Sequence, residues 1–281
     1  MRFYSETLSL KLDVFMLLRD LIHERTGLYY DERKREALAE KLTPLAMDRG
    51  LGSFLDYYYL LKYDLQAEEE WHRVMDALTV GETYFWREMD QVKALVDVVV
   101  PEFFRENPSA VLRIWSAACA SGEEPLTLAM VLEEAGWFDR ASIEINGSDV
   151  SPAAIETARR GIYRERSFRS LPFHLRRKYF EESDNRWKVL PGLHSRVSWS
   201  VANMLSEDEA GQLASSPVIF CRNAFIYFSE NSIKKAVCLF YKNMPDPGYL
   251  FVGASESLIR VTSDFELREI GGAFVYLKRQ R

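Results

Sequence analysis

Two neighbouring glutamates follow a loop of small residues, and together they form the first stretch of this chain that can bind a ligand. Residues 116–122 contain no bulky side chain, and Glu123 and Glu124 come directly after them. Such a loop lets a ligand lie against the backbone. Carboxylates at the start of a helix repel phosphate and occupy the partial positive charge there, so a pyrophosphate ligand is disfavoured.

The motifs of other nucleotide sites are missing from the sequence. There is no GxGxxG and no GKS or GKT, which argues against a nicotinamide dehydrogenase and against a P-loop protein. A ligand with a sulfonium, an ammonium and ribose hydroxyls suits an acidic mouth, and S-adenosylmethionine has all three. The alternative is that Glu123 and Glu124 only complement the helix dipole.

Further polar side chains follow other predicted strands, and the carboxyl ends of parallel strands form the ligand edge of such a sheet. Asp149 ends a strand over 143–149 and is placed to accept hydrogen bonds from ribose hydroxyls. Alternatively, Asp149 only caps the helix that follows. Arg222 and Asn223 come directly after a buried strand over 217–221, which suggests polar groups aimed into a cleft.

Two more stretches are candidates for the same edge. Residues 203–205 follow a predicted strand over 197–201. Residues 79–88 combine hydroxyls, a glycine, three aromatics and an arginine, which is unusual for a linker. The alternative for them is a structured hinge whose aromatics pack between domains. A helix over 89–104 is expected next.

The elements that position these groups alternate between strand and helix. Residues 113–130 begin as a strand and continue as a helix, because apolar residues recur at helical spacing after Gly122. Strands and helices then alternate up to a final antiparallel pair, so the fold class is α/β with a doubly wound, Rossmann-like sheet. The later predicted strands cover 143–149, 197–201, 217–221, 248–253, 265–270 and 273–277.

Residues 1–78 are predicted to be helical only, without catalytic spacing. The first apolar stripe stops at Gly27, and Asp31 can cap a second helix that ends at Gly50. Ser53 can cap a third helix. We interpret this region as a small bundle that docks a partner, although its charged face can be simply solvated.

The bulk composition excludes several classes of protein. A chain of 281 residues suits one large domain with a smaller one, and a net charge of -6 argues against a general nucleic-acid binder. No apolar run is long enough to span a membrane, and the N-terminus has no signal-peptide pattern. Cys119, Cys221 and Cys238 lack metal-ligand spacing and suit a reducing cytosol.

Residues 159–196 are basic within this acidic chain. They hold eleven Lys and Arg against four Asp and Glu, a net charge of +7. Such a segment offers a surface for an acidic partner, although a solvated subdomain surface is an alternative. A helix over 171–180 and a short hairpin of 187–190 with 197–199 are predicted here.

At these residues the sequence resembles the CheR family, the S-adenosylmethionine-dependent methyltransferases that esterify glutamates of bacterial chemoreceptors. The resemblance covers nearly the whole chain. It implies a helical domain at 1–78, a class I methyltransferase domain at 79–281 and a small β-subdomain inserted at about 164–202. The matching stretches, in the family's order, are 79–88, 113–130, 147–163, 218–228 and 248–258.

The resemblance also implies the site residues by motif position. Arg87 and Tyr227 would act in catalysis. Family members commonly have Asn where this chain has Gly81, so a side-chain contact there is lost or replaced by backbone. The cofactor contacts would be Gly81, Thr83, Arg87, Glu124, Asp149, Asn203, Met204, Arg222 and Asn223.

The implied enzyme is a protein-glutamate O-methyltransferase that converts S-adenosylmethionine to S-adenosylhomocysteine. A glutamate carboxylate is already a nucleophile, so neither a general base nor a metal is required. Catalysis would rest on positioning and electrostatics. The implied partner is the cytoplasmic helical bundle of methyl-accepting chemoreceptors, and the implied process is chemotaxis signal transduction. We expect a cytoplasmic monomer with no membrane insertion and no nucleic-acid partner.

Some family members bind a receptor-tail pentapeptide through a glycine-rich loop. The matching residues 181–188 contain no glycine, so pentapeptide-independent binding is expected.

Two other functions are compatible with parts of the sequence. A non-catalytic signalling module that binds S-adenosylmethionine or receptors is favoured only by Gly81, and the intact Arg87, Glu124, Asp149 and Asn223 oppose it. A nucleic-acid methyltransferase is favoured by the basic segment and opposed by the acidic balance. The sequence identifies neither the receptor, the modified glutamates nor the output of the pathway.

Overall fold

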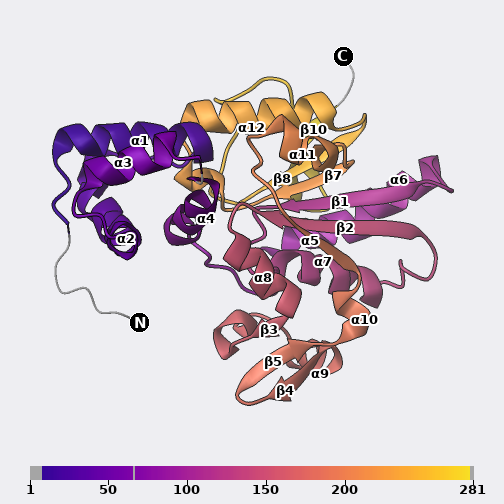
Figure 1. Ribbon diagram of the computed structural model, residues 1–281. Coiled ribbons are helices and arrows are strands. Elements are labelled where there is room, and N and C mark those ends of the chain that lie inside the picture. The colour runs from indigo at the N-terminus through magenta and orange to yellow at the C-terminus, as the bar shows by residue number, and fades with distance from the viewer. Residues whose placement is uncertain (1–7, 66, 279–281) are drawn as a thin grey trace. The chain divides into compact units, whose positions relative to one another are not determined.

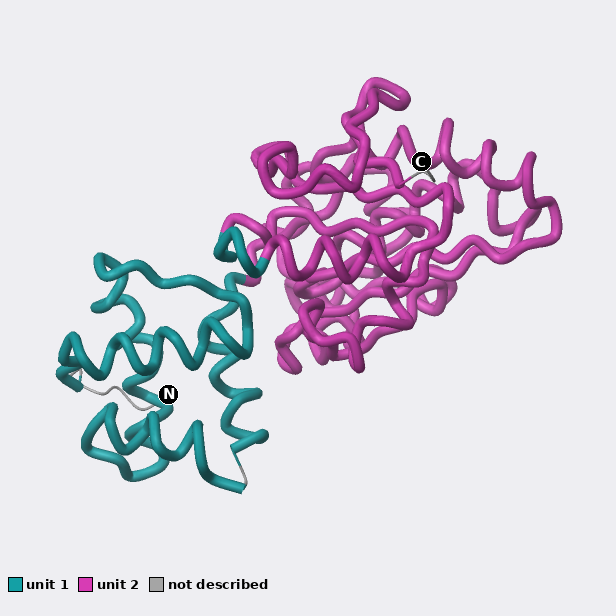
Figure 2. The backbone as a smooth tube through the Cα atoms, turned by 90° about the horizontal axis from the view of Figure 1, so that it is seen from above, with its two compact units in different colours: residues 1–80, 227–232 teal, residues 81–226, 233–281 magenta. Residues whose placement is uncertain are grey.

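The computed structural model of the chain describes residues 8–65 and 67–278, so residues 1–7 of the predicted helical region lie outside the described residues. The chain divides into two compact units (Figure 2). One comprises residues up to Val80 together with Tyr227–Ser232, and the other comprises Gly81–Ile226 and the chain from Ile233 onward. Within the described ranges, no helix is both long and apolar enough to span a membrane.

The larger unit is built on one main sheet. In the described part of the chain this sheet has seven strands in the order β6-β2-β1-β7-β8-β10-β9 (Figure 1). The strands from β6 to β8 are parallel, and β10 is antiparallel to both β8 and β9. The predicted doubly wound sheet with an antiparallel closing pair is therefore confirmed. The strands are β1 (Val111–Ala117), β2 (Ser142–Asp149), β6 (Val197–Val201), β7 (Val218–Cys221), β8 (Gly248–Val252), β9 (Glu266–Ile270) and β10 (Ala273–Lys278).

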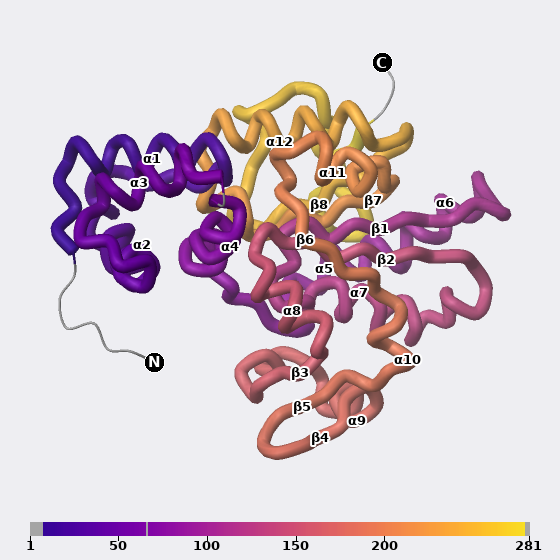
Figure 3. The backbone as a smooth tube through the Cα atoms, in the orientation of Figure 1, coloured from indigo at the N-terminus to yellow at the C-terminus, as the bar shows by residue number. Residues whose placement is uncertain are grey.

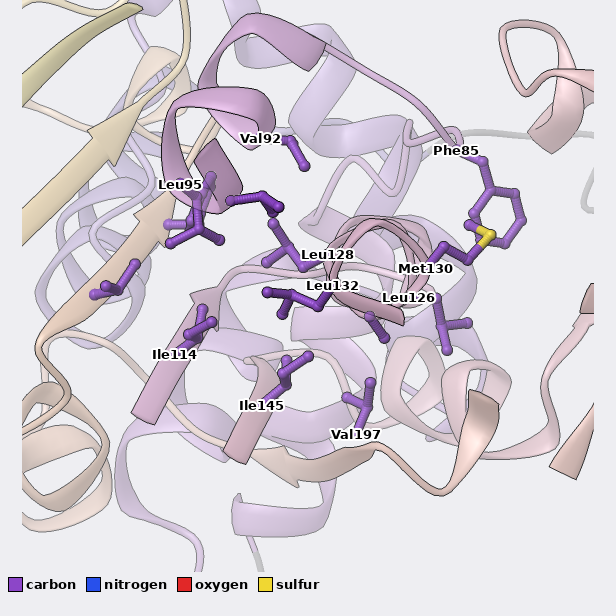
Figure 4. Close-up of a cluster of buried hydrophobic side chains, with 14 of the residues drawn as sticks. Phe85, Val92, Leu95, Ile114, Leu126, Leu128, Met130, Leu132, Ile145 and Val197 are labelled. Atoms are coloured by element: carbon purple, nitrogen blue, oxygen red, sulfur yellow. The ribbon is translucent and has the colours of Figure 1, made fainter. Parts of the chain in front are cut away.

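The core under one face of the main sheet forms between adjacent parallel strands and α7. Figure 4 shows Ile114, Ile145 and Val197 from β1, β2 and β6 on the same side as Leu128 and Leu132 of α7. All five side chains are buried. Burial of apolar side chains contributes about 1.5–3 kcal/mol each, so this face is a main source of the unit's stability.

Helices cover both faces of the sheet because successive side chains of a strand point to opposite sides. Ile114 faces α7, whereas its neighbour Trp115 contacts Phe240 of α12 with ring centroids 5.3 Å apart. Figure 1 shows α5, α7 and α8 on one side and α11 and α12 on the other. The helices are α5 (Met89–Ala94), α6 (Val100–Glu106), α7 (Glu123–Glu134), α8 (Pro152–Arg160), α11 (Glu207–Ala214) and α12 (Glu230–Asn243).

The helix predicted over 89–104 is present but not regular. A π-helical turn, η2 (Leu95–Val99), separates α5 from α6, and the Val100 N–H donates to the Leu95 carbonyl, five residues back. Pro101 follows and has no N–H to donate, so the regular ladder cannot continue through it. The wider turn is consistent with that break.

A small sheet follows α8 and contains much of the basic segment. Its order is β3-β5-β4, and these strands lie together with α9 in the trace (Figure 3). Aromatic rings fill its core, where Phe85 contacts Tyr163, Phe168 and Phe180 at 4.8–5.1 Å between ring centroids. The elements are β3 (Ile162–Tyr163), η3 (Glu165–Phe168), α9 (Phe173–Tyr179), β4 (Phe180–Ser183), β5 (Arg186–Val189) and α10 (Pro191–His194).

The predicted hairpin of 187–190 with 197–199 is wrong. β5 instead pairs with β4 across a two-residue turn at Asp184 and Asn185, while β6 pairs with β2 in the main sheet. Asp184 and Asn185 have φ of 49° and 59°, and these residue types tolerate the positive φ that tight hairpin turns require. Pro191 then begins α10, which leads the chain from the small sheet to β6.

The smaller unit contains helices joined by short connections, as predicted. Gly27 ends the first helix with φ of 78°, and the Ser53 hydroxyl accepts the Asp56 N–H to cap the third. Capping by the Asp31 side chain is wrong: a 3₁₀ turn, η1 (Glu32–Lys34), precedes the second helix, and the Asp31 carboxylate accepts no capping hydrogen bond. The helices are α1 (Leu12–Thr26), α2 (Arg35–Asp48), α3 (Phe54–Tyr63) and α4 (Ala67–Leu78).

A short segment from late in the chain completes this smaller unit. The Tyr29 N–H donates to the Tyr227 carbonyl at 3.0 Å, and Leu28 forms an antiparallel bridge with Phe228. The His23 ring nitrogen Nε2 lies 2.7 Å from the Ser229 hydroxyl. Residues 227–232 therefore belong to the helical unit by backbone and side-chain contacts.

Candidate active site

The loop after β1 is a compact turn that tolerates only small residues. Ala118 and Ala120 have positive φ, and Gly122 has φ of 93°. A side chain at Gly122 would place its Cβ 2.7 Å from the Trp199 ring, and one at Gly147 would lie 2.9 Å from the same ring. The indole of β6 thus packs under the loop and fixes its path, which keeps the backbone at the carboxyl end of β1 open to a ligand.

Asp149 ties the ends of β1 and β2 together. Its two carboxylate oxygens accept the N–H groups of Ala120 and Ser151, each at 2.9 Å, and the side chain is largely buried. The alternative that Asp149 only caps α8 is not what the structure shows, because the Ser151 hydroxyl caps that helix by accepting the Ala154 N–H.

Glu124 and Arg222 form a buried ion pair at the centre of the site. Their side chains are 13% and 3% exposed, and Arg222 Nε lies 2.5 Å from the carboxylate. The other Glu124 oxygen accepts the Ser116 hydroxyl at 2.6 Å. Arg222 also donates to the carbonyls of Arg87 and Glu88 at 3.1 and 3.2 Å. The guanidinium therefore joins β7, α7 and the segment around Arg87, with its charge paired as a buried charge must be.

Glu88 connects this network to Asn223. It has φ of 49° and Asn223 has φ of 59°, so both occupy the left-handed region that few residues other than glycine adopt. The Asn223 amide donates to Glu88 Oε1 at 3.3 Å, and the Ala254 N–H donates to Glu88 Oε2 at 3.2 Å. These contacts hold both strained residues in place.

Glu256 is a further, half-buried acid that sequence reasoning missed. Its carboxylate accepts the N–H groups of Gly253 at 2.7 Å, Asn223 at 2.8 Å and Ile226 at 3.2 Å. Burial raises the pKa of Glu256, while these backbone donors act in the opposite direction. Glu256 lies in a stretch that carries the family resemblance, but nothing local in the sequence indicates that it holds the loop after β7 some 30 residues away.

Arg87 differs from Arg222 because no short ion pair with another described residue neutralises it. Its nearest carboxylate oxygen, on Glu88, is 3.7 Å from Nε, and its other contact is a 3.4 Å hydrogen bond to the Glu82 carbonyl. The side chain is 26% exposed and lies over the Tyr84 ring at 5.4 Å. A second Arg side chain, Arg169, stacks on Tyr84 at 3.8 Å.

Asn203 and Met204 lie at the carboxyl end of β6. The Asn203 side-chain oxygen accepts the Leu205 N–H at 3.0 Å, and Met204 Sδ is 3.8 Å from Cys221 Sγ at the end of β7. Burial raises the pKa of the Cys119 and Cys221 thiols well above their ordinary value. Both cysteines are buried in the core, where a thiol has little tendency to ionise.

Glu123 lies against a separate pocket beside this network. Its carboxylate accepts the hydroxyls of Ser121 at 2.7 Å and Ser167 at 2.9 Å, and burial raises its pKa above the ordinary value. Gly81 and Thr83 line the same pocket. A Cβ placed on Gly81 would have nothing within 4 Å, so this position is open.

The structure thus brings together most of the predicted residues. Arg87, Glu124, Arg222 and Asn223 share one hydrogen-bond network at the carboxyl edge of the sheet. Asp149 and Asn203 lie at the carboxyl ends of β2 and β6 and have other partners. Tyr227 belongs to the helical unit, and its role in catalysis stays a prediction. No group of acidic, histidine or cysteine side chains in the described ranges could hold a metal.

The fold and this edge define the class of protein. A parallel sheet with an antiparallel closing pair, a small-residue loop after β1 and an acid after β2 form a class I S-adenosylmethionine-dependent methyltransferase. The residues suit that cofactor because carboxylates surround the loop, and Asp149 stands at the carboxyl end of β2, where folds of this kind bind ribose hydroxyls.

Comparison with known proteins names the family. The CheR methyltransferase SAM-binding domain matches residues 81–273, and the CheR methyltransferase all-alpha domain matches residues 13–79. The chain belongs to the CheR methyltransferase family. It is 34% identical to chemotaxis protein methyltransferase 2 of Vibrio cholerae over 94% of this chain and 92% of that protein. It is 30% identical to chemotaxis protein methyltransferase Cher2 of Pseudomonas putida, covering 93% and 96% of the two chains.

Proposed function

We propose that this chain transfers a methyl group from S-adenosylmethionine to glutamate side chains of methyl-accepting chemoreceptors in the cytoplasm. The products would be glutamate methyl esters and S-adenosylhomocysteine. The relatives that it matches are named chemotaxis protein methyltransferases. The observation that carries the proposal is Arg87, a half-buried guanidinium whose nearest polar contacts, to Glu88 and Glu82, are long.

Arg87 is suited to orient a substrate carboxylate. A guanidinium presents paired N–H donors that match a carboxylate, and the Arg222 hydrogen bonds to the backbone of Arg87 and Glu88 hold the segment in place. Its own contacts are weak, so its donors are available. A tighter buried ion pair would hold the carboxylate too strongly and lower its nucleophilicity.

The cofactor supplies an electrophilic methyl group on its sulfonium. Asp149 would accept hydrogen bonds from ribose hydroxyls, and the backbone of residues 118–122 would contact the amino-acid part. Asn203 and Met204 would border the base, and Gly81 and Thr83 would line the mouth. Tyr227 would shape the methyl-transfer site. Catalysis would come from orientation and from the fixed charges of the network.

The test is methyl transfer from radiolabelled S-adenosylmethionine to purified receptor cytoplasmic fragments. Base-labile label on glutamate is the expected result, because carboxyl methyl esters hydrolyse in base. Arg87→Ala should lower kcat/KM by at least about tenfold, the scale of removing an electrostatic contact to the reacting group. Arg105→Ala is the control, because Arg105 is exposed and its nearest carboxylate, Glu106, is 3.8 Å away.

Two outcomes would contradict the proposal. Cofactor binding by calorimetry without any label on receptor fragments would favour a non-catalytic signalling module. Near-normal turnover by Arg87→Ala with full cofactor affinity would refute the role of that residue.

We also propose pentapeptide-independent receptor binding by a monomer. The β4–β5 connection is a two-residue turn at Asp184 and Asn185 and contains no glycine, which leaves no flexible loop to enclose a peptide. Tight binding of a free receptor-tail pentapeptide would refute the first part, and a dimer in analytical ultracentrifugation would refute the second.

A further inference from the structure

The pocket beside the site is strongly basic. It has a volume of about 650 Å³ and lies between residues 81–83, the loop after β1, α8 and the small sheet. Its arginines come from separate elements, which converge only in the folded chain. They are Arg160, Arg164, Arg166, Arg169 and Arg186.

Three of these arginines are not neutralised within the described part of the chain. Arg169 pairs with Glu82 at 3.1 Å, and Arg160 lies 3.4 Å from Glu156. In contrast, Arg164, Arg166 and Arg186 are exposed and have no carboxylate within ion-pair distance among the described residues.

The neighbouring basic residues of the same segment show that such pairing is available. Arg176 pairs with Glu165, Lys178 pairs with Glu134, and Arg196 lies 3.5 Å from Glu133. The unneutralised charge of the segment is thus gathered partly in the pocket.

The carboxylates that face the pocket do not cancel this charge. Glu82 is held by Arg169, and Glu123 is buried and accepts the hydroxyls of Ser121 and Ser167. Burial raises the pKa of Glu123, while the charge of Arg166 acts in the opposite direction. The lining holds five arginines against two glutamates, so an anionic ligand would meet an excess of positive charge.

The pocket is connected to the proposed methyl-transfer site through Tyr84. The single ring of Tyr84 lies 3.8 Å from the guanidinium of Arg169, which lines the pocket, and 5.4 Å from that of Arg87, which belongs to the network. Gly81 and Thr83 line the pocket and precede Arg87 in the same segment. A peptide segment whose carboxylate reaches Arg87 can therefore extend into the pocket.

We propose that Arg164, Arg166 and Arg186 bind acidic side chains that flank the methyl-accepting glutamate of the substrate. This inference rests on the proposed function and names the chemistry of the substrate segment. Arginines spread over an open pocket match several carboxylates spaced along a helix. Arg166 lies in the 3₁₀ turn η3 with Arg164 directly before it, and Arg186 begins β5, so these groups do not come from a helix N-terminus of the kind that commonly binds phosphate.

The test compares two double variants that remove the same charge from the same subdomain. Arg164→Gln with Arg166→Gln removes two pocket residues. Arg177→Gln with Lys188→Gln removes two exposed basic residues that do not line the pocket. The pocket variant should raise KM for a receptor fragment about three- to tenfold and weaken its dependence on salt, with kcat and cofactor affinity unchanged. The control variant should stay within about twofold.

A binding measurement separates this inference from the proposed function. The probe is a glutamate-rich helical peptide whose methyl-accepting position is Gln, so that binding is read without turnover. The wild-type chain should bind it and the pocket variant should bind it about three- to tenfold more weakly, with Arg186→Gln acting in the same direction. If receptor fragments are not methylated but the pocket variant still binds the peptide more weakly than wild type, the proposed function fails. The inference that the pocket binds acidic side chains is then still supported.

Three results would overturn the inference. The first is equal affinity of the wild-type chain and the pocket variant for the acidic peptide. The second is an equal rise in KM for the pocket and control variants. The third is a loss of affinity for inorganic phosphate or an oligonucleotide, but not for the peptide, in the pocket variant.

Discussion

At the scale of single residues, Arg222 donates more of the site's hydrogen bonds than any other side chain described there. Its guanidinium satisfies the Glu124 carboxylate and the carbonyls of Arg87 and Glu88. Arg222→Gln would leave Glu124 as a buried charge without its partner. We expect a loss of about 3–5 kcal/mol of unfolding free energy, measured by urea denaturation.

The matched control for this substitution is Arg113→Gln. Arg113 lies 3.1 Å from Glu144, but both side chains are more than half exposed, so the loss should stay below about 1 kcal/mol. Similar losses for the two variants would show that the buried network is not a stabilising feature.

Glu123 gives a prediction about pH. Because burial raises the pKa of Glu123 in the native state, that state binds more protons than the unfolded chain just above the ordinary value of 4.5. The contribution of Glu123 to the free energy of unfolding is therefore fully present below pH 4.5. It is lost as the pH rises through the raised pKa. Glu123→Gln should remove that dependence, so that its stability relative to wild type increases from pH 4 to neutral pH.

Urea unfolding at several pH values is the measurement for Glu123. The Gln amide can replace the carboxylate, because its oxygen can accept a hydrogen bond from one serine hydroxyl and its NH2 group can donate to the other. Hydrogen bonds to Ser121 and Ser167 can therefore both be retained. An unchanged difference between variant and wild type across this pH range would show that the native-state pKa of Glu123 is not raised.

At the scale of elements, the loop after β1 depends on its contact with β6. Gly122→Ala combines a left-handed φ of 93° with a Cβ that would lie 2.7 Å from the Trp199 ring. The strain and the displaced indole should together cost about 2 kcal/mol or more. Cofactor affinity should fall as well, which calorimetry can measure.

Gly81→Asn provides the contrasting substitution. A Cβ at Gly81 would meet nothing within 4 Å, and its φ is not in the left-handed region. The variant should keep its stability within about 0.5 kcal/mol, and an added amide at the mouth should tighten cofactor binding. A large loss of stability for Gly81→Asn would contradict the open space seen at this position.

The elements that the sequence predicts correctly are those with local signals. Small residues before Glu123 and alternation of strands and helices are enough to place β1, α7 and Asp149. Partners that lie far apart along the chain are not predictable in this way. The pairing of β6 with β2 and the hydrogen bond between Glu256 and the Asn223 N–H form only in the folded sheet. No local sequence pattern indicates either of them.

At the scale of the whole molecule, His23 contacts residues 227–232, the late segment that completes the helical unit. Its Nε2 lies 2.7 Å from the Ser229 hydroxyl and 3.0 Å from the Ser232 hydroxyl. His23→Ala should cost about 1 kcal/mol of unfolding free energy, because both hydroxyls lose a partner. His72→Ala is the control, because His72 is exposed on α4.

Turnover of the same variants tests whether the segment also matters for catalysis. Tyr227 lies at the start of this segment, so a looser segment should lower kcat of His23→Ala more than that of His72→Ala. Equal stability and equal turnover of the two variants would show that the His23 contact has no consequence.

Because residues 227–232 are part of the helical unit, they also affect how the gene can be rearranged. A bundle that ends at Val80 looks like a cassette that recombination could move to another protein. Yet this bundle is completed by a strand bridge at Leu28 and Phe228, encoded some 200 positions downstream. A transferred cassette would lack that piece, and the remaining chain would carry it without its neighbours. The two parts are therefore expected to be inherited together.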